Sequence, residues 1–218
     1  WTLRFKATLA AAPWGFIIGK KKMNSGEIRS QLRVKRRSLT EQEQQLAAQK
    51  ISSLVNKESL FIQGNRVGVY LANDGEIDPS LIVSMARTAG CHCFLPVIDP
   101  IHAHCLYFAQ YDLDSELNAN RYGILEPVVE QAMMLSARDL DILLMPLVAF
   151  DREGTRIGMG GGFYDRSLAF MAETEYPKPA LIGLAHSLQE MPHLVRQQWD
   201  IPLHLIATEK EVICVKQK

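Results

Sequence analysis

A glycine-rich segment between residues 146 and 166 has the residue types and spacing best suited to chemistry. It leaves an apolar run, passes five glycines between Val148 and Gly162, and enters a helix-like sequence at Tyr164. Glycines before a helix let backbone N–H groups converge on phosphate oxygens, because no side chain blocks the approach. Each charge-assisted hydrogen bond contributes roughly 1.5–3 kcal/mol, so about three or four donors would hold a polyphosphate. Gly158–Gly162 is therefore a candidate phosphate-binding loop.

Charged residues flank this loop on both sides. Arg156 and Arg166 could neutralise phosphate charge, and Asp165 could hold a magnesium ion that bridges phosphates. Known phosphate motifs do not match, because the dinucleotide fingerprint requires glycine where Phe163 stands and no Gly-Lys-Ser/Thr tripeptide occurs in the sequence. The alternative interpretation is a flexible turn, with Asp165 as an ordinary carboxylate in the first turn of a helix.

The elements around the loop alternate between strands and helices. Apolar runs predict strands at Arg66–Leu71, Cys91–Val97, Cys105–Gln110, Leu140–Met145, Ala180–Leu184, Leu203–Ala207 and Glu211–Val215. Helices are predicted to begin at Ser25, at the capping box of Thr40 and Glu43, and at Asp78-Pro79, with another over Tyr164–Met171. This alternation predicts an α/β fold with a mostly parallel sheet between helices, and ligands bind such sheets at the carboxyl ends of the strands.

Composition excludes several classes of function. Lysine plus arginine equals aspartate plus glutamate at 24 each in 218 residues, which argues against a surface devoted to nucleic acid. The basic run Arg33–Arg37 is better interpreted as a solvated helix face, or as a cluster facing the bound phosphates, than as an RNA contact. Four cysteines without a disulfide-like spacing favour a reducing compartment. We expect a monomeric cytoplasmic protein with no nucleic-acid or membrane partner.

The first 22 residues are treated apart from the fold. The apolar run Leu9–Ile18 contains Pro13 and Gly15, is too short to span a bilayer, and is followed by lysines rather than by a cleavage site. We interpret residues 1–22 as an upstream or artificially added segment, with a targeting segment as the alternative. Residues 23–218 are predicted to form a single domain.

A second cluster of chemically able residues is interpreted as structural. Cys91 and Cys93 have one residue between them, whereas structural zinc sites favour two to four. Buried strand cysteines, with loop histidines at His102 and His104, are the preferred interpretation. His186 is a polar group near a strand end for which the sequence gives no role.

The segment Pro146–Arg166 resembles the signature of the 5-formyltetrahydrofolate cyclo-ligases, also called 5,10-methenyltetrahydrofolate synthetases. The resemblance extends over about residues 25–215 and includes the basic first helix, Gly75-Glu76-Ile77-Asp78 and Trp199-Asp200-Ile201-Pro202. It implies a Rossmann-like three-layer α/β/α sandwich. It also implies ATP- and Mg²⁺-dependent cyclisation of 5-formyltetrahydrofolate to 5,10-methenyltetrahydrofolate, with release of ADP and phosphate.

The resemblance also implies roles for individual residues. ATP would be bound by Arg29, Arg33, Arg36, Arg156, Ile157, Gly158, Met159, Gly160, Gly161, Gly162, Phe163 and Tyr164. The folate would contact Leu71, Glu76, Gly160, Gly161, Gly162, Phe163 and Tyr164. Asp165 and Asp200 would bind Mg²⁺, and Arg156 and Arg166 would stabilise charge in catalysis.

Two positions depart from the family pattern. Ser25 and Gly161 stand where lysines are common, and Arg33 or Arg36 could supply the missing positive charge. The implied reaction transfers the γ-phosphoryl group to the formyl oxygen, after which N10 attacks the activated carbon. Two rivals remain open at this point: an enzyme of similar topology such as a sugar-phosphate isomerase or CoA transferase, and a catalytically silent folate- or nucleotide-binding protein.

Overall fold

A computed structural model describes residues 23–99, 104–173 and 178–216. In this part of the chain, the main sheet has seven strands. In spatial order they are β11 (Val212–Cys214), β10 (Leu205–Ala207), β9 (Ala180–Leu184), β6 (Ile142–Pro146), β1 (Arg66–Gly68), β2 (His92–Ile98) and β3 (Leu106–Gln110). The central pairs are parallel, and the outer pairs β2–β3 and β10–β11 are antiparallel. The predicted α/β fold with a mostly parallel sheet is confirmed.

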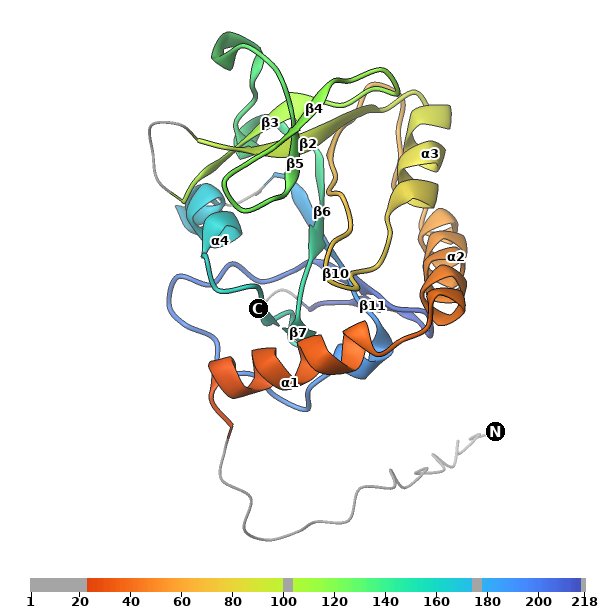
Figure 1. Ribbon diagram of the computed structural model, residues 1–218, viewed down its shortest axis with the longest axis vertical. Coiled ribbons are helices and arrows are strands. Elements are labelled where there is room, and N and C mark those ends of the chain that lie inside the picture. The colour runs from red at the N-terminus through yellow and green to blue at the C-terminus, as the bar shows by residue number, and fades with distance from the viewer. Residues whose placement is uncertain (1–22, 100–103, 174–177, 217–218) are drawn as a thin grey trace, which may run out of the picture.

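Helices cover both faces of the sheet (Figure 1). The α-helices are α1 (Ser25–Arg37), α2 (Glu41–Lys57), α3 (Ser80–Thr88) and α4 (Phe163–Ser167), and the short 3₁₀ helices are η1 (Gln131–Met133), η2 (Ala137–Asp139), η3 (Ala169–Glu173) and η4 (Ser187–Gln189). Strand β6 alternates between the two cores, with Ile142 and Leu144 packed in the α2–α3 layer and Leu143 and Met145 in the layer of η3. Alternate side chains of a strand point to opposite faces of the sheet, and both faces are buried at β6. The sequence of β6 is therefore apolar at every position rather than at alternate ones.

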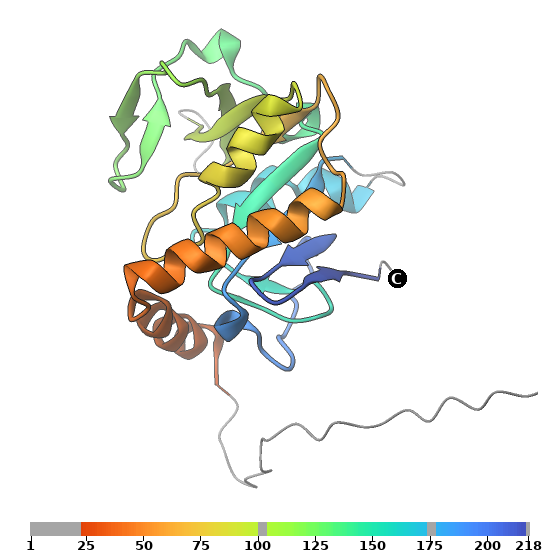
Figure 2. The same ribbon diagram turned by 90° about the vertical axis from the view of Figure 1, so that its right-hand side faces the viewer.

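Helix α1 packs against the end of the sheet rather than over a face (Figure 2). Ile28 and Leu32 are buried with Val148, Ala149 and Leu194 in a small separate core. The cap of this helix is Asn24 rather than the predicted Ser25, because the Asn24 Oδ1 accepts a hydrogen bond from the Glu27 N–H at 2.9 Å. This packing places the basic face of α1 beside the carboxyl end of β6.

Several local predictions are confirmed and others are wrong. Thr40 and Glu43 form the predicted capping box at the start of α2. The helix predicted over Tyr164–Met171 is instead the one-turn α4 followed by η3. Two short hairpins were not predicted, namely β4 (Leu117–Ala119) with β5 (Leu125–Pro127), and β7 (Ala149–Phe150) with β8 (Arg156–Ile157). Strands of two or three residues are too short to give a periodic signal.

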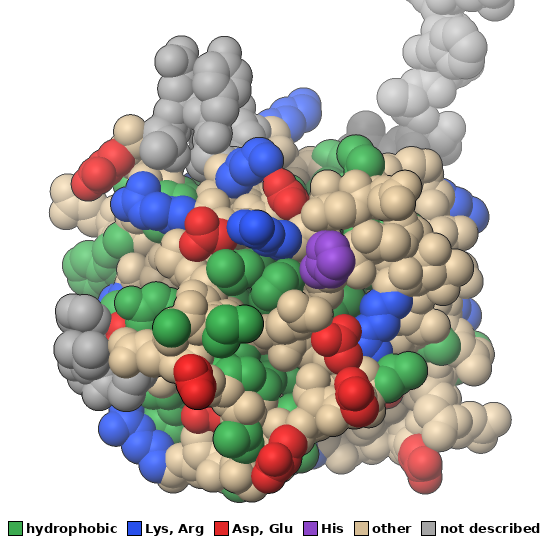
Figure 3. All heavy atoms as spheres, turned by 90° about the horizontal axis from the view of Figure 1, so that it is seen from above, with side chains coloured by type: hydrophobic (Ala, Val, Ile, Leu, Met, Phe, Trp, Pro, Cys, Tyr) green, Lys and Arg blue, Asp and Glu red, His purple; other side chains and the backbone are tan. Residues whose placement is uncertain are grey.

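On the face shown in Figure 3, acidic and basic side chains are interspersed. Among the described residues, no helix combines the length and apolarity that crossing a bilayer requires. The predictions for residues 1–22 and for His102 lie outside the described residues.

Candidate nucleotide and folate site

A cavity of about 1200 Å³ opens at the carboxyl ends of β1 and β6. Most of the predicted site residues line it: Arg29, Arg33, Leu71, Glu76, Arg156, Ile157, Gly158, Met159, Gly160, Gly161, Gly162, Phe163, Tyr164, Asp165 and Asp200. Ser25 also lines it. These residues come from α1, the turn after β1, the glycine loop and the loop before β10, so the fold brings distant parts of the sequence to one site.

The glycine loop adopts a backbone that glycine alone accommodates well. Gly160 has φ +103° and Gly162 has φ +67°, both in the region that side chains disfavour. Arg29 crosses the loop, and its Nε donates a hydrogen bond to the Gly158 carbonyl at 2.8 Å. Because α4 has only five residues, the loop backbone and the nearby cations, rather than a long helix dipole, are the groups available to an anion.

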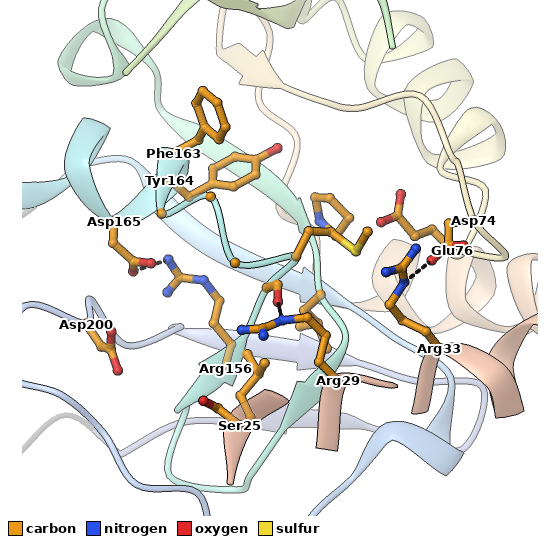
Figure 4. A pocket seen from close by; sticks show the side chains of 18 of the residues that line it. Ser25, Arg29, Arg33, Asp74, Glu76, Arg156, Phe163, Tyr164, Asp165 and Asp200 are labelled. Carbon is orange, nitrogen blue, oxygen red and sulfur yellow. Dashed lines mark hydrogen bonds and ion pairs between the residues drawn. The ribbon is translucent and has the colours of Figure 1, made fainter. Parts of the chain in front are cut away.

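Arg156 is an internal anchor of the site. Its side chain is only 6% exposed, and its Nη2 donates to Asp165 Oδ1 at 2.6 Å while its Nη1 donates to the Ile201 carbonyl. Burial lowers the pKa of Arg156, and the carboxylates of Asp165 and Asp200 partly oppose that effect. Figure 4 shows Asp165 and Asp200 on the side of the cavity toward which the Arg156 guanidinium points. Arg156 therefore holds Asp165 in place.

The two aspartates have the chemistry of a magnesium site completed by a substrate. Asp165 and Asp200 both line the cavity, and the Asp200 carboxylate accepts a hydrogen bond from the Gln197 N–H at 2.8 Å. Magnesium is commonly held by one or two carboxylates together with substrate phosphates. In the described ranges, no group of three or more His, Cys, Asp or Glu residues is placed to hold a metal by itself. Two carboxylates beside a phosphate-sized loop fit a metal that arrives with its nucleotide.

Two predicted site residues do not line the cavity. Arg36 is fully buried, and its guanidinium donates to the carbonyls of Asp74 and Leu147 and to the Asp74 carboxylate. The expectation that Arg36 contacts ATP or replaces the missing lysines is corrected by this geometry, because the protein itself satisfies the guanidinium. Arg166 is exposed and donates to the Gly161 carbonyl at 2.6 Å, so it braces the loop from outside rather than facing the cavity as predicted.

Glu76 lies on the other side of the cavity from the two aspartates (Figure 4). Burial raises the pKa of Glu76, and the nearby Arg36 guanidinium, 3.5 Å from Oε1, opposes this without cancelling it. The Glu76 carboxylate is thus shielded from water, with the Arg36 guanidinium balancing its charge on one side. It also lines the cavity, where a ligand can donate hydrogen bonds to it. Leu71 lines the cavity nearby and is half-buried.

Some residues that line the cavity were not assigned to the site from the sequence. Tyr122 in the β4–β5 hairpin packs edge-on against Phe163, with ring centroids 5.9 Å apart, and His104 lies 5.2 Å from the same ring. Trp199, to which no role was assigned, also lines the cavity and is exposed. No spacing pattern links these residues, because they meet only through tertiary packing. Cys91 and Cys93, by contrast, are buried as predicted.

Comparisons with known proteins identify the family of this chain. The model of the 5-formyltetrahydrofolate cyclo-ligase family matches residues 21–209. The 5-formyltetrahydrofolate cyclo-ligase of Escherichia coli (strain K12) is 38% identical over 181 residues, which are 83% of this chain and 98% of the relative. That of Haemophilus influenzae is 34% identical over 177 residues, covering 81% of this chain and 93% of the relative.

A solved structure supports the same relationship. The NMR structure of Aquifex aeolicus 5,10-methenyltetrahydrofolate synthetase superposes with a TM-score of 0.73 at 29% identity. The superposition covers 90% of this chain and 95% of that one. Sequence, fold and the match to the family model thus agree over nearly the whole length. This chain belongs to the 5-formyltetrahydrofolate cyclo-ligase family.

Proposed function

We propose that this protein catalyses the ATP- and Mg²⁺-dependent closure of 5-formyltetrahydrofolate to 5,10-methenyltetrahydrofolate, through phosphorylation of the formyl oxygen. Membership of the cyclo-ligase family supports the cyclisation and argues against the isomerase and CoA transferase alternatives. The observation that carries the proposal is a single cavity lined by both the glycine loop and Glu76. Its volume of about 1200 Å³ exceeds the roughly 300–1,000 Å³ typical of a site for one small ligand, as two co-substrates require.

The nucleotide would occupy the side of the cavity formed by the loop and α1. Backbone N–H groups of Gly158–Gly162 would approach the phosphates, and Arg29 and Arg33 would supply positive charge in place of the lysines absent at Ser25 and Gly161. Asp165 and Asp200 would hold Mg²⁺, which supplies neutralisation of phosphate charge when bound.

The folate would place its pterin ring against Glu76 and Leu71. An ionised carboxylate can accept two parallel hydrogen bonds from the donor-rich edge of the pterin. The γ-phosphoryl group then moves to the formyl oxygen, which turns a poor leaving group into phosphate. N10 attacks the activated carbon, the C–O bond breaks, and the amine loses its proton. The protein acts by positioning and charge stabilisation, without a covalent nucleophile.

The direct test is an assay with purified protein. The near-ultraviolet absorbance of the methenyl product should appear only when ATP, Mg²⁺ and 5-formyltetrahydrofolate are all present, with ADP and phosphate formed in equal amounts. Turnover without ATP would contradict the proposal. Thermal stabilisation by both ligands without any product would favour the silent binding protein instead.

Gly158→Ala is expected to weaken Mg·ATP binding by about tenfold or more while leaving the melting temperature unchanged. A Cβ at Gly158 meets nothing within 4 Å, and its φ is compatible with alanine, so the free protein has room for the methyl group. A phosphate close to the backbone would collide with this methyl group and lose hydrogen bonds to the loop. Each lost charge-assisted hydrogen bond costs roughly 1.5–3 kcal/mol. Titration calorimetry measures the affinity. Unchanged ATP affinity would place the phosphates elsewhere.

The pH dependence of folate use is expected to report the ionisation of Glu76. Burial raises the pKa of Glu76, so the carboxylate is protonated at a higher pH than an ordinary glutamate. Only the ionised form accepts both hydrogen bonds, so kcat/KM for the folate should fall as pH is lowered, beginning above the usual glutamate range. A pH profile of kcat/KM measures this. An acid limb that is unchanged in Glu76→Gln would assign the titration to another group.

A further inference from the structure

The turn that presents Glu76 to the cavity has an unusual backbone. The Glu76 N–H donates to the Asn73 carbonyl at 3.0 Å, and both central residues have positive φ, +54° at Asp74 and +74° at Gly75. This is the pattern of a type I′ turn. A Cβ at Gly75 would lie 3.0 Å from the Arg36 carbonyl oxygen, so glycine lets the turn pack directly on α1. The position of Glu76 therefore depends on how this turn is attached to α1.

One carboxylate makes most of that attachment. Asp74 accepts hydrogen bonds from three arginines of α1: from Arg33 Nε and Arg36 Nη2 at 2.8 Å each, and from Arg37 Nε. Arg33 lies three and four residues before the other two on the helix, so the three project from one face. Burial by itself would raise the pKa of Asp74, but the hydrogen bonds from the arginines together lower it to about 2, so the carboxylate is charged at all working pH values.

The same turn is fixed from its other side. Arg36 Nε donates to the Asp74 carbonyl at 2.7 Å, and the buried His186 places Nε2 3.2 Å from the Gly75 carbonyl. Because a carbonyl oxygen only accepts hydrogen bonds, His186 Nε2 carries the hydrogen in this contact. Burial lowers the pKa of His186, which keeps the ring neutral. The turn is thus held at two of its backbone carbonyls, by Arg36 and His186, and at the Asp74 carboxylate, by the three arginines.

Arg33 links this arrangement to the nucleotide side. Arg33 lines the cavity, and its Nε is the donor to Asp74, while Glu76 stands two residues after Asp74 in the same turn. Figure 4 shows Arg33, Asp74 and Glu76 together on one side of the cavity. The charge on Asp74 therefore orients a cation expected to face ATP and a carboxylate expected to face the folate.

We propose that Asp74 is a positioning residue of the reaction, which fixes Arg33 and the Glu76 turn relative to each other through its three-arginine contact. This inference rests on the proposed function, because it assigns a contact with ATP to Arg33 and a contact with the folate to Glu76. Asp74 lines the cavity, but three arginines engage its carboxylate, so in this scheme it acts through Arg33 and the turn rather than on a substrate. Its loss should weaken the use of both substrates, although the two contact different residues.

Asp74→Asn tests the inference with little disturbance of the backbone, because asparagine tolerates positive φ and retains one acceptor oxygen. We expect KM for both 5-formyltetrahydrofolate and ATP to rise about tenfold or more, with a smaller fall in kcat, since a misplaced binding group costs binding energy. A purely structural role would lower the melting temperature and the active fraction, which reduces kcat and leaves both KM values unchanged.

Asp141→Asn is the matched control. Asp141 accepts hydrogen bonds from the Arg66 N–H at 2.9 Å and from Lys178 Nζ at 2.8 Å, and it does not line the cavity. This variant is expected to lose stability without a change in either KM. If the wild-type protein turns over and Asp74→Asn keeps both KM values within about twofold, the positioning role is overturned and the proposed function stands. No turnover by the wild-type protein would overturn both.

Discussion

Replacing Glu76 by glutamine is expected to lower kcat/KM for 5-formyltetrahydrofolate by about 100-fold or more. The change removes one or two charge-assisted hydrogen bonds, each worth roughly 1.5–3 kcal/mol, and places an NH₂ donor against pterin donors. The affinity for Mg·ATP should be unchanged, because Glu76 lies across the cavity from the aspartates (Figure 4). Steady-state kinetics and a folate titration measure the two effects.

The fold is expected to tolerate this substitution well. Because burial raises the pKa of Glu76, the ionised carboxylate makes folding less favourable at neutral pH than a neutral side chain would. Glutamine removes that cost, and Arg36 keeps its contacts with Asp74. The melting temperature should therefore stay the same or rise. Glu58→Gln, at the exposed end of α2, is the control and should change neither property. A folate affinity equal to that of the wild type would contradict the role of Glu76.

Replacing Asp165 by asparagine is expected to lower kcat by about 100-fold or more at moderate Mg²⁺ concentration. Removing one group that stabilises developing charge typically costs a factor of about 10²–10³ in rate. Because the proposed charge serves the metal, higher Mg²⁺ should restore part of the activity. The measurement is kcat as a function of Mg²⁺ concentration, with Asp200→Asn expected to behave in the same way.

Stability cannot account for so large a loss of activity. Asparagine can still accept the hydrogen bond from Arg156, so the expected destabilisation is about 1 kcal/mol. A domain with roughly 5–15 kcal/mol of stability stays folded after such a change. A fall in melting temperature that matches the loss of activity, with no response to added Mg²⁺, would show that Asp165 serves only as the partner of Arg156.

The candidate site could be located from the sequence because its glycine loop depends on local features. Five glycines between a buried strand and a helix, with Asp165 and Arg156 beside them, form one continuous segment whose backbone requirements are visible in residue type. The parallel sheet could be predicted from the sequence for a similar reason, because apolar runs alternate with capped helices along the chain. Where an element spans two or three residues, as in β4, β5, β7 and β8, no periodicity exists to be read.

The basic residues of α1 show what the sequence by itself left undetermined. Arg29, Arg33 and Arg36 look equivalent as cations on one helix, and each was expected to face ATP. Only the packing of α1 on the Asp74–Gly75 turn decides that Arg36 is fully buried while Arg33 reaches the cavity. Residues three and four apart share one face of a helix, so rotation about the axis does not separate Arg33 from Arg36. Their positions along the axis do, because the Gly75 backbone packs directly on Arg36.

The sequence thus determined the family, the α/β fold class and the position of the glycine loop that we propose binds phosphate, because each depends on residue types that are close together along the chain. The tertiary structure alone decided which charged side chains face the cavity and which are paired with other groups inside the protein. The physical reason is that burial and pairing depend on neighbours distant in sequence. Asp74 pairs with three arginines that lie 37 to 41 residues before it, and Arg156 donates to the carbonyl of Ile201, 45 residues after it, so both acquire their roles only when distant segments come together.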